Sequence, residues 1–289
     1  MRNEEIIMAG PLDGKVAIVT GAGRGLGRVM TLALLAAGAS VAATELDAEA
    51  LDETGQAAEA AGAGERILDV VADVTRDDSA PRIVRATTER FGRLDILLNN
   101  AGINMALFRR PDTKPTGKFW EVTPEEFRRI IDVNVVAAFL MSRAALPVML
   151  KQRWGRIINV TTSLDTMYRG GMQPYGGSKA ANEAHLLGLA QELEGTGVTA
   201  NVLVPGGAAN TRMVSVGQEP DRAKLVSPDV MAAPLVWLCS TASDGVNGLR
   251  FIGARWDQSL PPAEAAKKAG APAAWQQLGR QAIVPNSPR

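Results

Sequence analysis

The stretch TGAGRGLG, residues 20–27, decides the fold, because it joins a strand-like run to a helix-like run through closely spaced glycines. It follows KVAIVT, a short β-branched segment of buried-strand type, and it leads into the helical pattern GRVMTLALLAAG. Gly21 lets the chain turn sharply, Gly25 lets the backbone approach a pyrophosphate, and Gly27 lets the helix pack on the sheet. A glycine turn alone can be purely structural, but a strand before it and a helix after it predict a dinucleotide site at the helix N-terminus.

Outward from this turn, strand and helix patterns alternate along the chain. The strands are apolar without alternation, which indicates an α/β fold with a parallel sheet covered on both faces. Asp47 and Thr123 are expected N-caps, and Pro124 fits the first position of a helix. Strands are expected at residues 15–20, 40–45, 66–74, 94–102, 155–162, 198–205 and 249–254, and helices at 27–38, 47–62, 77–92, 123–152, 174–194 and 227–242.

The chain shows no linker that would split its core, so one domain is expected over residues 13–257. Residues 1–12 form an N-terminal extension. Residues 103–122 form a long irregular insertion, interrupted by prolines and a glycine. Residues 258–289 are rich in Ala and Pro, and we expect a tail that wraps the domain or a partner subunit, or is partly disordered.

Composition excludes several classes of function. Positive and negative side chains balance at 31 each, so nothing indicates binding to nucleic acid or to an anionic membrane. No apolar run of about 18 residues indicates a membrane span, and the start does not resemble a secretory signal. His185 is the only histidine and Cys239 the only cysteine, which argues against a metal site, Ser-His-Asp hydrolysis and an internal disulfide. A reducing cytoplasm is the expected compartment.

An acidic residue near the end of the second expected strand bears on the choice of cofactor. Glu45 lies 18 residues after Gly27, where a carboxylate can bind the ribose hydroxyls of NAD and repel the 2′-phosphate of NADP. Arg24 favours the opposite choice, because a guanidinium in the glycine turn can reach a 2′-phosphate. The direct like-charge penalty decides for NAD, with NADP as the alternative. Asp73 and Val74 are expected to flank the adenine, although Asp73 can equally cap the next helix.

Four motifs in order give the chain a family resemblance. With TGAGRGLG, NNAG at residues 99–102, VNV around Asn134, and YGGSK at residues 175–179, the chain resembles the short-chain dehydrogenase/reductase family from about Asp13 to Ala242. The resemblance implies a single Rossmann-type, doubly wound domain with about seven parallel strands. It also implies hydride transfer between a nicotinamide cofactor and a small alcohol or ketone.

The proton that accompanies hydride transfer can be argued from the residues themselves. A tyrosine with a pKa of about 10 is a poor base near neutrality, and a nearby ammonium stabilises its phenolate. Tyr175 and Lys179 lie four residues apart, so they can share one face of a helix. An isolated pair of this kind would more often be an ordinary surface pair. By resemblance, Tyr175 is the catalytic acid/base, Lys179 binds the nicotinamide ribose and lowers the tyrosine pKa, and Asn134 holds a water of the proton relay.

Three consecutive hydroxyl residues compete for the role of helper to Tyr175. The family expects a serine 13 residues before the tyrosine, a spacing that selects Thr162, whereas Ser163 has the expected residue type. Neighbours on a strand point to opposite faces, so Thr161 is expected to face away. Thr162 is favoured by spacing, and Ser163 stays open.

The remaining cofactor contacts follow from the resemblance. Asn99 and its turn steady the central strand, and Pro205 and Gly206 bend beneath the nicotinamide. Thr211 would bind the carboxamide, although it falls one residue later than the usual spacing. The expected cofactor-binding set is Gly21, Arg24, Gly25, Leu26, Gly27, Glu45, Asp73, Val74, Asn100, Ala101, Gly102, Tyr175, Lys179, Pro205, Gly206 and Thr211.

Other features leave the substrate and the assembly open. Basic residues of the insertion can meet an acidic substrate but are more often solvated: Arg109, Arg110, Lys114 and Lys118. Five apolar residues can wall a pocket or simply pack in the core: Trp120, Met167, Tyr168, Met172 and Trp256. The resemblance implies a homodimer or homotetramer formed through the helices near residues 134–152 and 175–194. Two alternatives remain: an NADP-dependent ketone reductase of the 3-oxoacyl type, and a dinucleotide-binding sensor without turnover.

Overall fold

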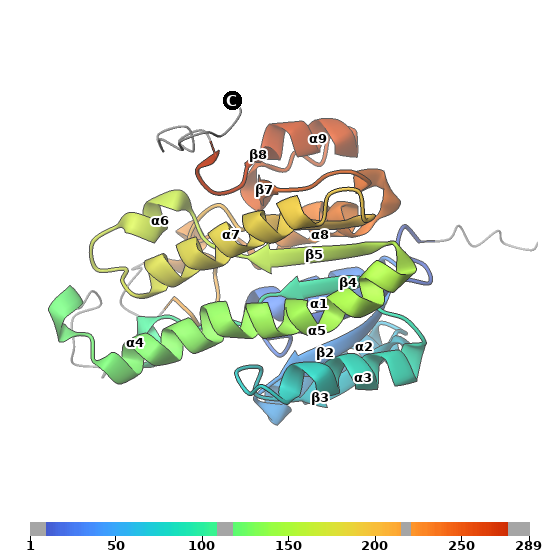
Figure 1. The fold of residues 1–289 in the computed structure, drawn as a ribbon, viewed down its shortest axis with the longest axis horizontal. Helices are drawn as coiled ribbons and strands as arrows, with labels where there is room; N and C mark the ends of the chain where they lie inside the picture. Colours follow the sequence, from blue (N-terminus) through green and yellow to red (C-terminus); the bar gives the residue numbers. More distant parts are fainter. Residues whose placement is uncertain (1–9, 109–117, 215–220, 277–289) are drawn as a thin grey trace, which may run out of the picture.

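A computed structural model describes residues 10–108, 118–214 and 221–276 of the chain. Its central feature is one eight-stranded sheet with the strand order β3-β2-β1-β4-β5-β6-β7-β8 (Figure 1). From β1 the chain adds strands first on one side, as β2 and β3, and then on the other, beginning with β4. Sheets of this type bind their ligands in the crevice at this point, between β1 and β4. The strands are β1 (Val16–Thr20), β2 (Ser40–Glu45), β3 (Ile67–Val71), β4 (Ile96–Asn99), β5 (Gly155–Val160), β6 (Val198–Val204), β7 (Leu249–Ile252) and β8 (Gly270–Pro272).

The predicted parallel sheet is confirmed, with one addition. Strands β1 to β7 pair in parallel, and β8 pairs antiparallel with β7, so that Phe251 lies opposite Gly270. The expected number of strands was therefore one too small. The extra strand lies in the Ala- and Pro-rich tail, where a three-residue strand leaves no periodic pattern.

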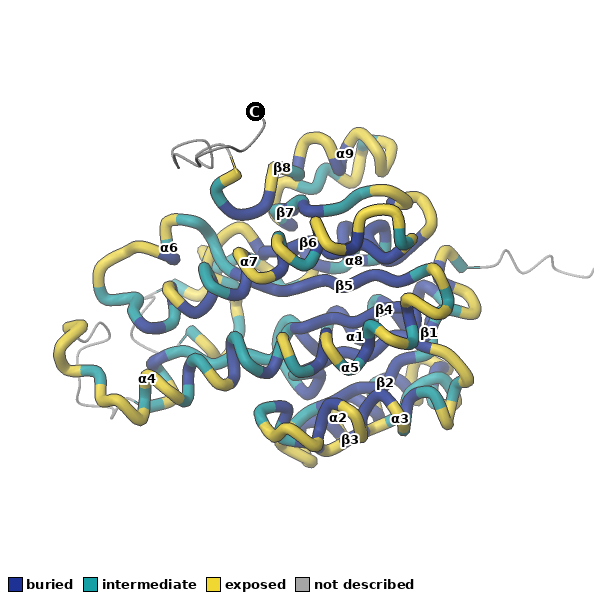
Figure 2. Tube along the Cα trace, viewed as in Figure 1, coloured by how far each residue is buried: buried dark blue, intermediate teal, exposed yellow. Residues whose placement is uncertain are grey.

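Helices cover both faces of the sheet, as the unbroken apolar strands predict. One face carries α1 (Gly25–Ala36), α2 (Ala48–Ala60) and α8 (Ala232–Cys239), and the other carries α3 (Ser79–Phe91), α5 (Ala137–Gln152) and α7 (Tyr175–Glu192). Along β1, Ala17 and Val19 contribute to the first core and Ile18 to the second. All three are fully buried, which is why the strand sequence does not alternate (Figure 2).

Local capping explains where two of the predicted helices begin. Asp47 accepts a hydrogen bond from the Ala50 N–H at 3.2 Å and starts α2. Thr123 and Glu126 form a capping box at the start of α4 (Pro124–Ile131). Helix α3 begins at Ser79 after Asp78, without a side-chain cap.

The long helix predicted at 123–152 is continuous over Pro124–Gln152 but changes its hydrogen-bond pattern in the middle. Between α4 and α5, residues Asp132–Val136 form a π-helical turn, and Asn134 lies inside it. A short helix, α6 (Leu164–Tyr168), also precedes α7 and was not expected. Neither feature changes the hydrophobic period enough to be visible in sequence.

The expectation that the chain has no strongly apolar 18-residue segment is wrong. The continuous helical segment Pro124–Gln152 contains an 18-residue window of mean hydropathy 1.8, long and apolar enough by composition to cross a membrane. In this fold 39% of that window is buried, and Ala137, Met141, Ala145 and Met149 of α5 pack into the second core. Core helices of globular proteins commonly have this composition.

The chain after residue 257 does not form a loose tail as far as residue 276. It forms α9 (Pro262–Ala269), which leads directly into β8. Ala265, Ala269 and Ala273 are buried, and Ala273 donates its N–H to the Gly248 carbonyl at 3.1 Å. Residues 258–276 therefore extend the sheet at the β7 edge.

Candidate active site

The glycine turn between β1 and α1 has the close approaches that the motif predicts. Gly21 has a φ of 66°, and a Cβ there would lie 2.9 Å from the Ala101 Cα. A Cβ at Gly27 would overlap the Gly21 carbonyl oxygen. Gly25 has a φ of 53° and begins α1, and Leu26 follows it in the first turn of the helix. The turn therefore leaves backbone and helix N–H groups open at the crevice.

The turn after β4 packs directly against this glycine turn. The Asn100 side chain donates to the Thr20 carbonyl at 2.9 Å and to the Gly21 carbonyl at 3.0 Å. The Thr20 hydroxyl accepts from the backbone N–H groups of Asn100 and Ala101. Asn99 donates to Ser142 and Asn159, which ties β4 to α5 and β5. Asn99 thus steadies the central strand, as the resemblance implies, and Thr20 is a contributor that the motif did not single out.

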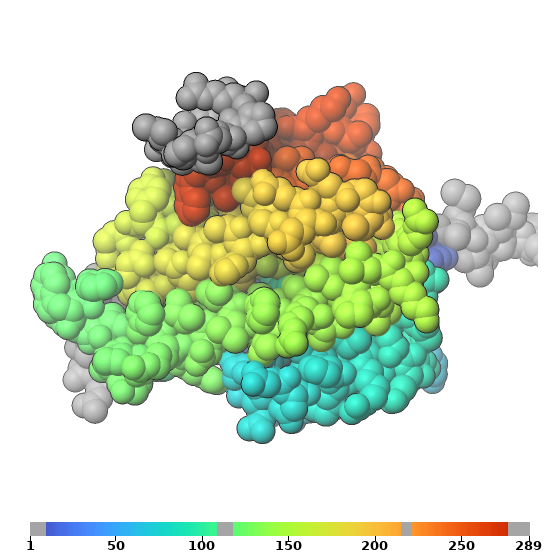
Figure 3. Space-filling model, viewed as in Figure 1, coloured from blue at the N-terminus to red at the C-terminus, as the bar shows by residue number. Residues whose placement is uncertain are grey.

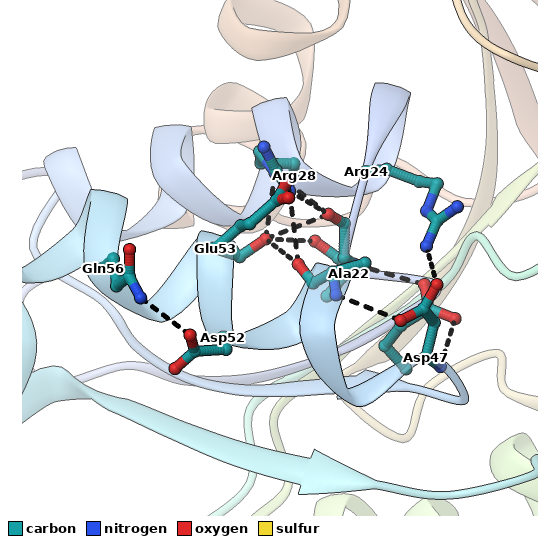
Figure 4. Close-up of polar contacts among 11 residues, drawn as sticks. Ala22, Arg24, Arg28, Asp47, Asp52, Glu53 and Gln56 are labelled. Atoms are coloured by element: carbon teal, nitrogen blue, oxygen red, sulfur yellow. Dashed lines mark hydrogen bonds and ion pairs between the residues drawn. The ribbon is translucent and has the colours of Figure 1, made fainter.

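At the end of β2, two carboxylates and one guanidinium meet. Glu45 accepts from the Gly23 N–H at 3.3 Å, and a Cβ at Gly23 would lie 2.7 Å from the Glu45 Cγ. Arg24 forms an ion pair with Asp47 (Figure 4). The pKa of Asp47 is lowered by the Ala50 N–H and then by Arg24. Sequence reasoning identified Asp47 only as a helix cap and missed Gly23 entirely.

After β3, Asp73 is held in a local turn. Its carboxylate accepts from the Thr75 N–H at 3.0 Å and from the Thr75 hydroxyl at 2.6 Å, and Arg129 lies 3.9 Å away. Burial acts to raise the pKa of Asp73, but these hydrogen bonds lower it overall. Asp73 does not cap α3, which follows Asp78. Val74 is buried in the second core.

Tyr175 and Thr162 face each other beyond the end of β5. Tyr175 is the first residue of α7 and is partly buried. Burial raises the pKa of its phenol, and the nearby Thr162 hydroxyl acts in the opposite direction. The pKa of Tyr175 is therefore raised overall, whereas the resemblance implies that Lys179 lowers it. The hydroxyl at the 13-residue spacing is therefore the one beside the tyrosine.

The two neighbouring hydroxyls have other partners. Ser163 is the N-cap of α6, and its hydroxyl lies 2.8 Å from the Thr166 hydroxyl and accepts from the Thr166 N–H. The Thr161 hydroxyl is buried and donates to Glu183 at 2.8 Å. The Thr161 hydroxyl is thus bound to Glu183 on α7, and its orientation away from Tyr175 stays a prediction.

Lys179 lies one helical turn after Tyr175 and is almost completely buried. Its Nζ donates to the Val160 carbonyl at 2.9 Å. Burial lowers the pKa of Lys179 to about 8. A Cβ at Gly102 would lie 3.1 Å from this Nζ and 3.3 Å from the Asn134 Oδ1. Lys179, Asn134 and the turn after β4 thus meet at one place.

Asn134 uses its whole amide within the protein. Its Oδ1 accepts from the Ile103 N–H at 2.8 Å, and its Nδ2 donates to the Ile103 carbonyl and to the Ser178 hydroxyl, both at 2.9 Å. Its own carbonyl accepts from Asn182 at 2.7 Å. These bonds hold the turn after β4 against α7, and sequence reasoning missed both Ser178 and Asn182.

The segment after β6 covers the glycine turn from the other side. Pro205 accepts from the Ala254 N–H at 3.0 Å, and Gly206 has a φ of 101°. A Cβ at Gly25 would lie 3.0 Å from the Thr211 Cγ2, so Thr211 lies over the start of α1. Asn104 donates to the Met213 carbonyl at 3.0 Å and joins this segment to the chain after β4.

A cavity near the start of α7 has a different lining from the apolar residues named in the sequence analysis. A cavity of about 300 Å³ lies beside Pro174, the residue before Tyr175, and is also lined by Phe119, Val122, Thr123, Pro124, Phe127 and Arg128. Met167 is buried and Trp256 packs on Trp237, whereas Trp120 and Tyr168 are exposed. None of the five expected wall residues is among the lining that the structure describes. Lys118 is exposed near the Trp120 ring, and Arg109, Arg110 and Lys114 lie outside the described residues.

Comparison with known proteins agrees with this geometry. Residues 15–221 match the family model described as short chain dehydrogenase. The chain belongs to the short chain dehydrogenase family. This dehydrogenase is accordingly an oxidoreductase that acts on CH–OH groups or ketones with a nicotinamide cofactor.

Individual relatives cover most of the dehydrogenase. It is 34% identical to a 3-oxoacyl-[acyl-carrier-protein] reductase of Synechocystis over 72% of this chain and 80% of that protein. It is 34% identical to the short chain dehydrogenase/reductase astE of Aspergillus oryzae over 82% of this chain and 92% of that protein. The crystal structure of a 3-ketoacyl-(acyl-carrier-protein) reductase from Brucella melitensis complexed with NADH matches with a TM-score of 0.73 and 28% identity, over 83% and 96% of the two chains.

Proposed function

We propose that this dehydrogenase transfers a hydride between NAD(H) and the carbon of a secondary alcohol or ketone, with Tyr175 as the acid/base. The observation that carries the proposal is that α7 holds Tyr175 at its first residue and the buried Lys179 one turn later, where the Lys179 Nζ lies 3.1 Å from the position of a Cβ at Gly102 in the turn after β4. A sensor without turnover has no need of such a pair.

The crevice fits a dinucleotide. Gly21, Gly25 and Gly27 add no side chains to the glycine turn, and α1 directs its N-terminus there. Gly21, Arg24, Gly25, Leu26 and Gly27 would hold the phosphates. When bound, the nicotinamide supplies the site for hydride. Glu45 would hold the adenosine ribose and Lys179 the nicotinamide ribose. Asp73, Val74, Asn100, Ala101, Gly102, Pro205, Gly206 and Thr211 would border the rest.

The protein's own groups then handle the proton. In reduction, Tyr175 donates its phenolic proton to the substrate oxygen, and in oxidation it accepts the proton of the alcohol. The Thr162 hydroxyl donates a hydrogen bond to the same oxygen and orients it. Asn134 keeps the turn after β4 in place, and we retain its part in a water relay as a proposal.

Charges at the end of β2 favour NAD over NADP. A 2′-phosphate there would meet the carboxylates of Glu45 and Asp47. Arg24, the one cation in the glycine turn, is already paired with Asp47 (Figure 4). The cost of placing a dianion beside two carboxylates exceeds the attraction of a guanidinium that must first leave its partner.

The cofactor proposal is tested by comparing NADH and NADPH affinity. The parent should prefer NADH, and the double change Glu45→Gln with Asp47→Asn should narrow that preference about tenfold or more, since each tenfold step needs only ~1.4 kcal/mol. Asp52→Asn is the matched control. Asp52 is exposed on the same helix and bonds Gln56 at 2.7 Å, so this change should leave the preference unaltered. An equal preference in the double variant and the parent would contradict the proposal.

The substrate is proposed as a small ketone or secondary alcohol. The 3-oxoacyl reductase relatives make 3-oxoacyl thioesters the first substrates to include in a panel followed by NADH absorbance. An NADP-dependent reductase of the same type remains the second candidate, favoured by Arg24 alone.

For the assembly we propose a homodimer or homotetramer through α5 and α7, and for the compartment the cytoplasm.

The acid/base assignment is tested with the only two tyrosines of the chain. Tyr175→Phe should lower turnover by about 10²- to 10⁴-fold, because general acid–base catalysis contributes that much. Tyr168→Phe is the control, since Tyr168 is exposed and bonds Asp165. Titration calorimetry with NADH should give similar affinities for both variants. Near-normal turnover in Tyr175→Phe would refute the assignment.

A further inference from the structure

A buried ion pair contacts the two residues that follow β5, Thr161 and Thr162. Glu183 on α7 is completely buried, and Arg250 on β7 is 5% exposed. The Arg250 Nε lies 3.2 Å from the Glu183 Oε1. Sequence analysis assigned neither residue a role, because one lies in a helix pattern and the other in a strand pattern.

Each charge also contacts one of two consecutive residues at the end of β5. Glu183 accepts from the Thr161 hydroxyl at 2.8 Å, and Arg250 donates from Nη2 to the Thr162 carbonyl at 2.8 Å. The bond to Glu183 holds the Thr161 side chain. The bond from Arg250 holds the peptide group between Thr162 and Ser163. Together they tie the Thr161 side chain and the Thr162 backbone to one buried ion pair.

The C-terminal segment supplies a further partner of the pair. The Ala274 N–H donates to the Glu183 Oε1 at 2.9 Å, and Ala273 beside it is fully buried. Residues 270–276 therefore reach the same carboxylate that holds Thr161. The chain after the last parallel strand is in this way connected to the end of β5 through one side chain.

An ion pair at this depth is costly to desolvate, and apolar side chains of similar volume often serve stability equally well. Its hydrogen bonds to Thr161, Thr162 and Ala274 give it a geometric role that apolar residues cannot provide. We propose that Glu183 and Arg250 are positioning residues that aim the Thr162 hydroxyl at Tyr175, and that segment 270–276 takes part in the active site through Glu183. The proposal rests on the role of Thr162 proposed above.

The test observes Tyr175 directly and needs no substrate. Full-length protein is labelled with tyrosine carrying carbon-13 at the ring carbon that bears the hydroxyl, whose resonance responds to hydrogen bonding of the phenol. Tyr168→Phe assigns the two signals. Thr162→Ala removes the hydroxyl beside Tyr175, and the resulting change in the chemical shift of Tyr175 is the reference for the other variants.

Two variants then probe the pair. Glu183→Gln keeps the shape of the side chain and removes its charge. Glu183→Gln with Arg250→Met leaves no unpaired charge and covers the case in which the single variant does not fold. Both should move the Tyr175 signal in the same direction as Thr162→Ala and by a comparable amount. Turnover should fall in both while the KM for NADH stays within about twofold.

Asp244→Asn is the matched control, since it removes the partner of Arg156, a buried arginine at the opposite end of β5. It should lower the melting temperature and leave the Tyr175 signal in place. The proposal is overturned if the Glu183 variants leave the Tyr175 signal at its parental position, or if Asp244→Asn moves it equally. If Thr162→Ala does not displace the Tyr175 signal, Thr162 does not contact Tyr175, and the proposed positioning role is wrong. The acid/base assignment is separate, because it would still be supported if the Tyr175→Phe variant lost activity.

Discussion

At the scale of single residues, the three consecutive hydroxyls after β5 have three different functions. Thr161 anchors to Glu183, Thr162 faces Tyr175, and Ser163 caps α6. Spacing from the tyrosine favoured Thr162, and strand alternation predicted the orientation of Thr161. The sequence could not separate Thr162 from Ser163, because that depends on where the strand ends and α6 begins, and a five-residue helix has no detectable period.

Substitutions at Thr162 and Ser163 test which of the two hydroxyls assists Tyr175. Thr162→Ala should lower turnover by about 10²- to 10³-fold, the usual effect of losing one donor to a developing oxyanion. Thr162→Ser should retain most of the activity, since it keeps the hydroxyl. Ser163→Ala should destabilise the fold by about 1 kcal/mol through the lost cap and leave turnover nearly unchanged. Steady-state kinetics and thermal unfolding of the three variants decide the matter, and a larger kinetic loss in Ser163→Ala would reverse the assignment.

At the scale of elements, the strand–turn–helix unit at β1 and α1 is the part best predicted from sequence. The bounds of β2 agree with the prediction, and Asp47 and Thr123 cap the helices where expected. Sequence analysis missed the π-helical turn at Asp132–Val136. Such a turn shifts hydrogen bonds by one residue and leaves the apolar pattern almost intact, yet it positions Asn134 against Ile103.

Close packing in this unit makes Gly27→Ala a sharp test. The added Cβ would overlap the Gly21 carbonyl oxygen, so α1 must shift away from the crevice. We expect a destabilisation of about 1–3 kcal/mol and loss of NADH affinity. Gly188→Ala on α7 is the control, because its Cβ would meet no atom within 4 Å. That change should stabilise the protein by up to about 1 kcal/mol. Denaturant unfolding and NADH titration distinguish these outcomes, and unchanged NADH binding in Gly27→Ala would refute the packing argument.

At the scale of the whole molecule, the helices opposite α1 form one continuous surface. On the face seen in Figure 1 and Figure 3, α4 and α5 follow one another along one line, and α7 lies beside them. Phe139 on α5 is 59% exposed, and Leu150 lies further along the same helix, also exposed. The alternation of strand and helix patterns predicted a parallel α/β domain. The outer face of α5 could not be assigned from its sequence, because apolar residues occur on nearly every side of this helix.

This surface leads to a prediction about assembly. Phe139→Glu should reduce the proposed oligomer to a smaller species, since a charge would be buried in the subunit contact. Val71→Glu is the control, an equally drastic change at a residue 48% exposed on the edge strand β3. Light scattering coupled to size-exclusion chromatography measures the mass of each. An unchanged mass for Phe139→Glu, or a monomeric parent, would place the subunit contact elsewhere or remove it.

The hydrogen bond from Ala274 to Glu183 also has a consequence for biosynthesis. The two residues are 91 positions apart, and the later one belongs to the last segment that the structure describes. The ribosome makes the glycine turn early and the donor to the buried carboxylate late, and a domain folds as a unit. A nascent chain stalled before residue 270 would therefore lack the Ala274 N–H that binds Glu183. The synthesis of the two halves of the active site is separated in time by the length of the polypeptide between them.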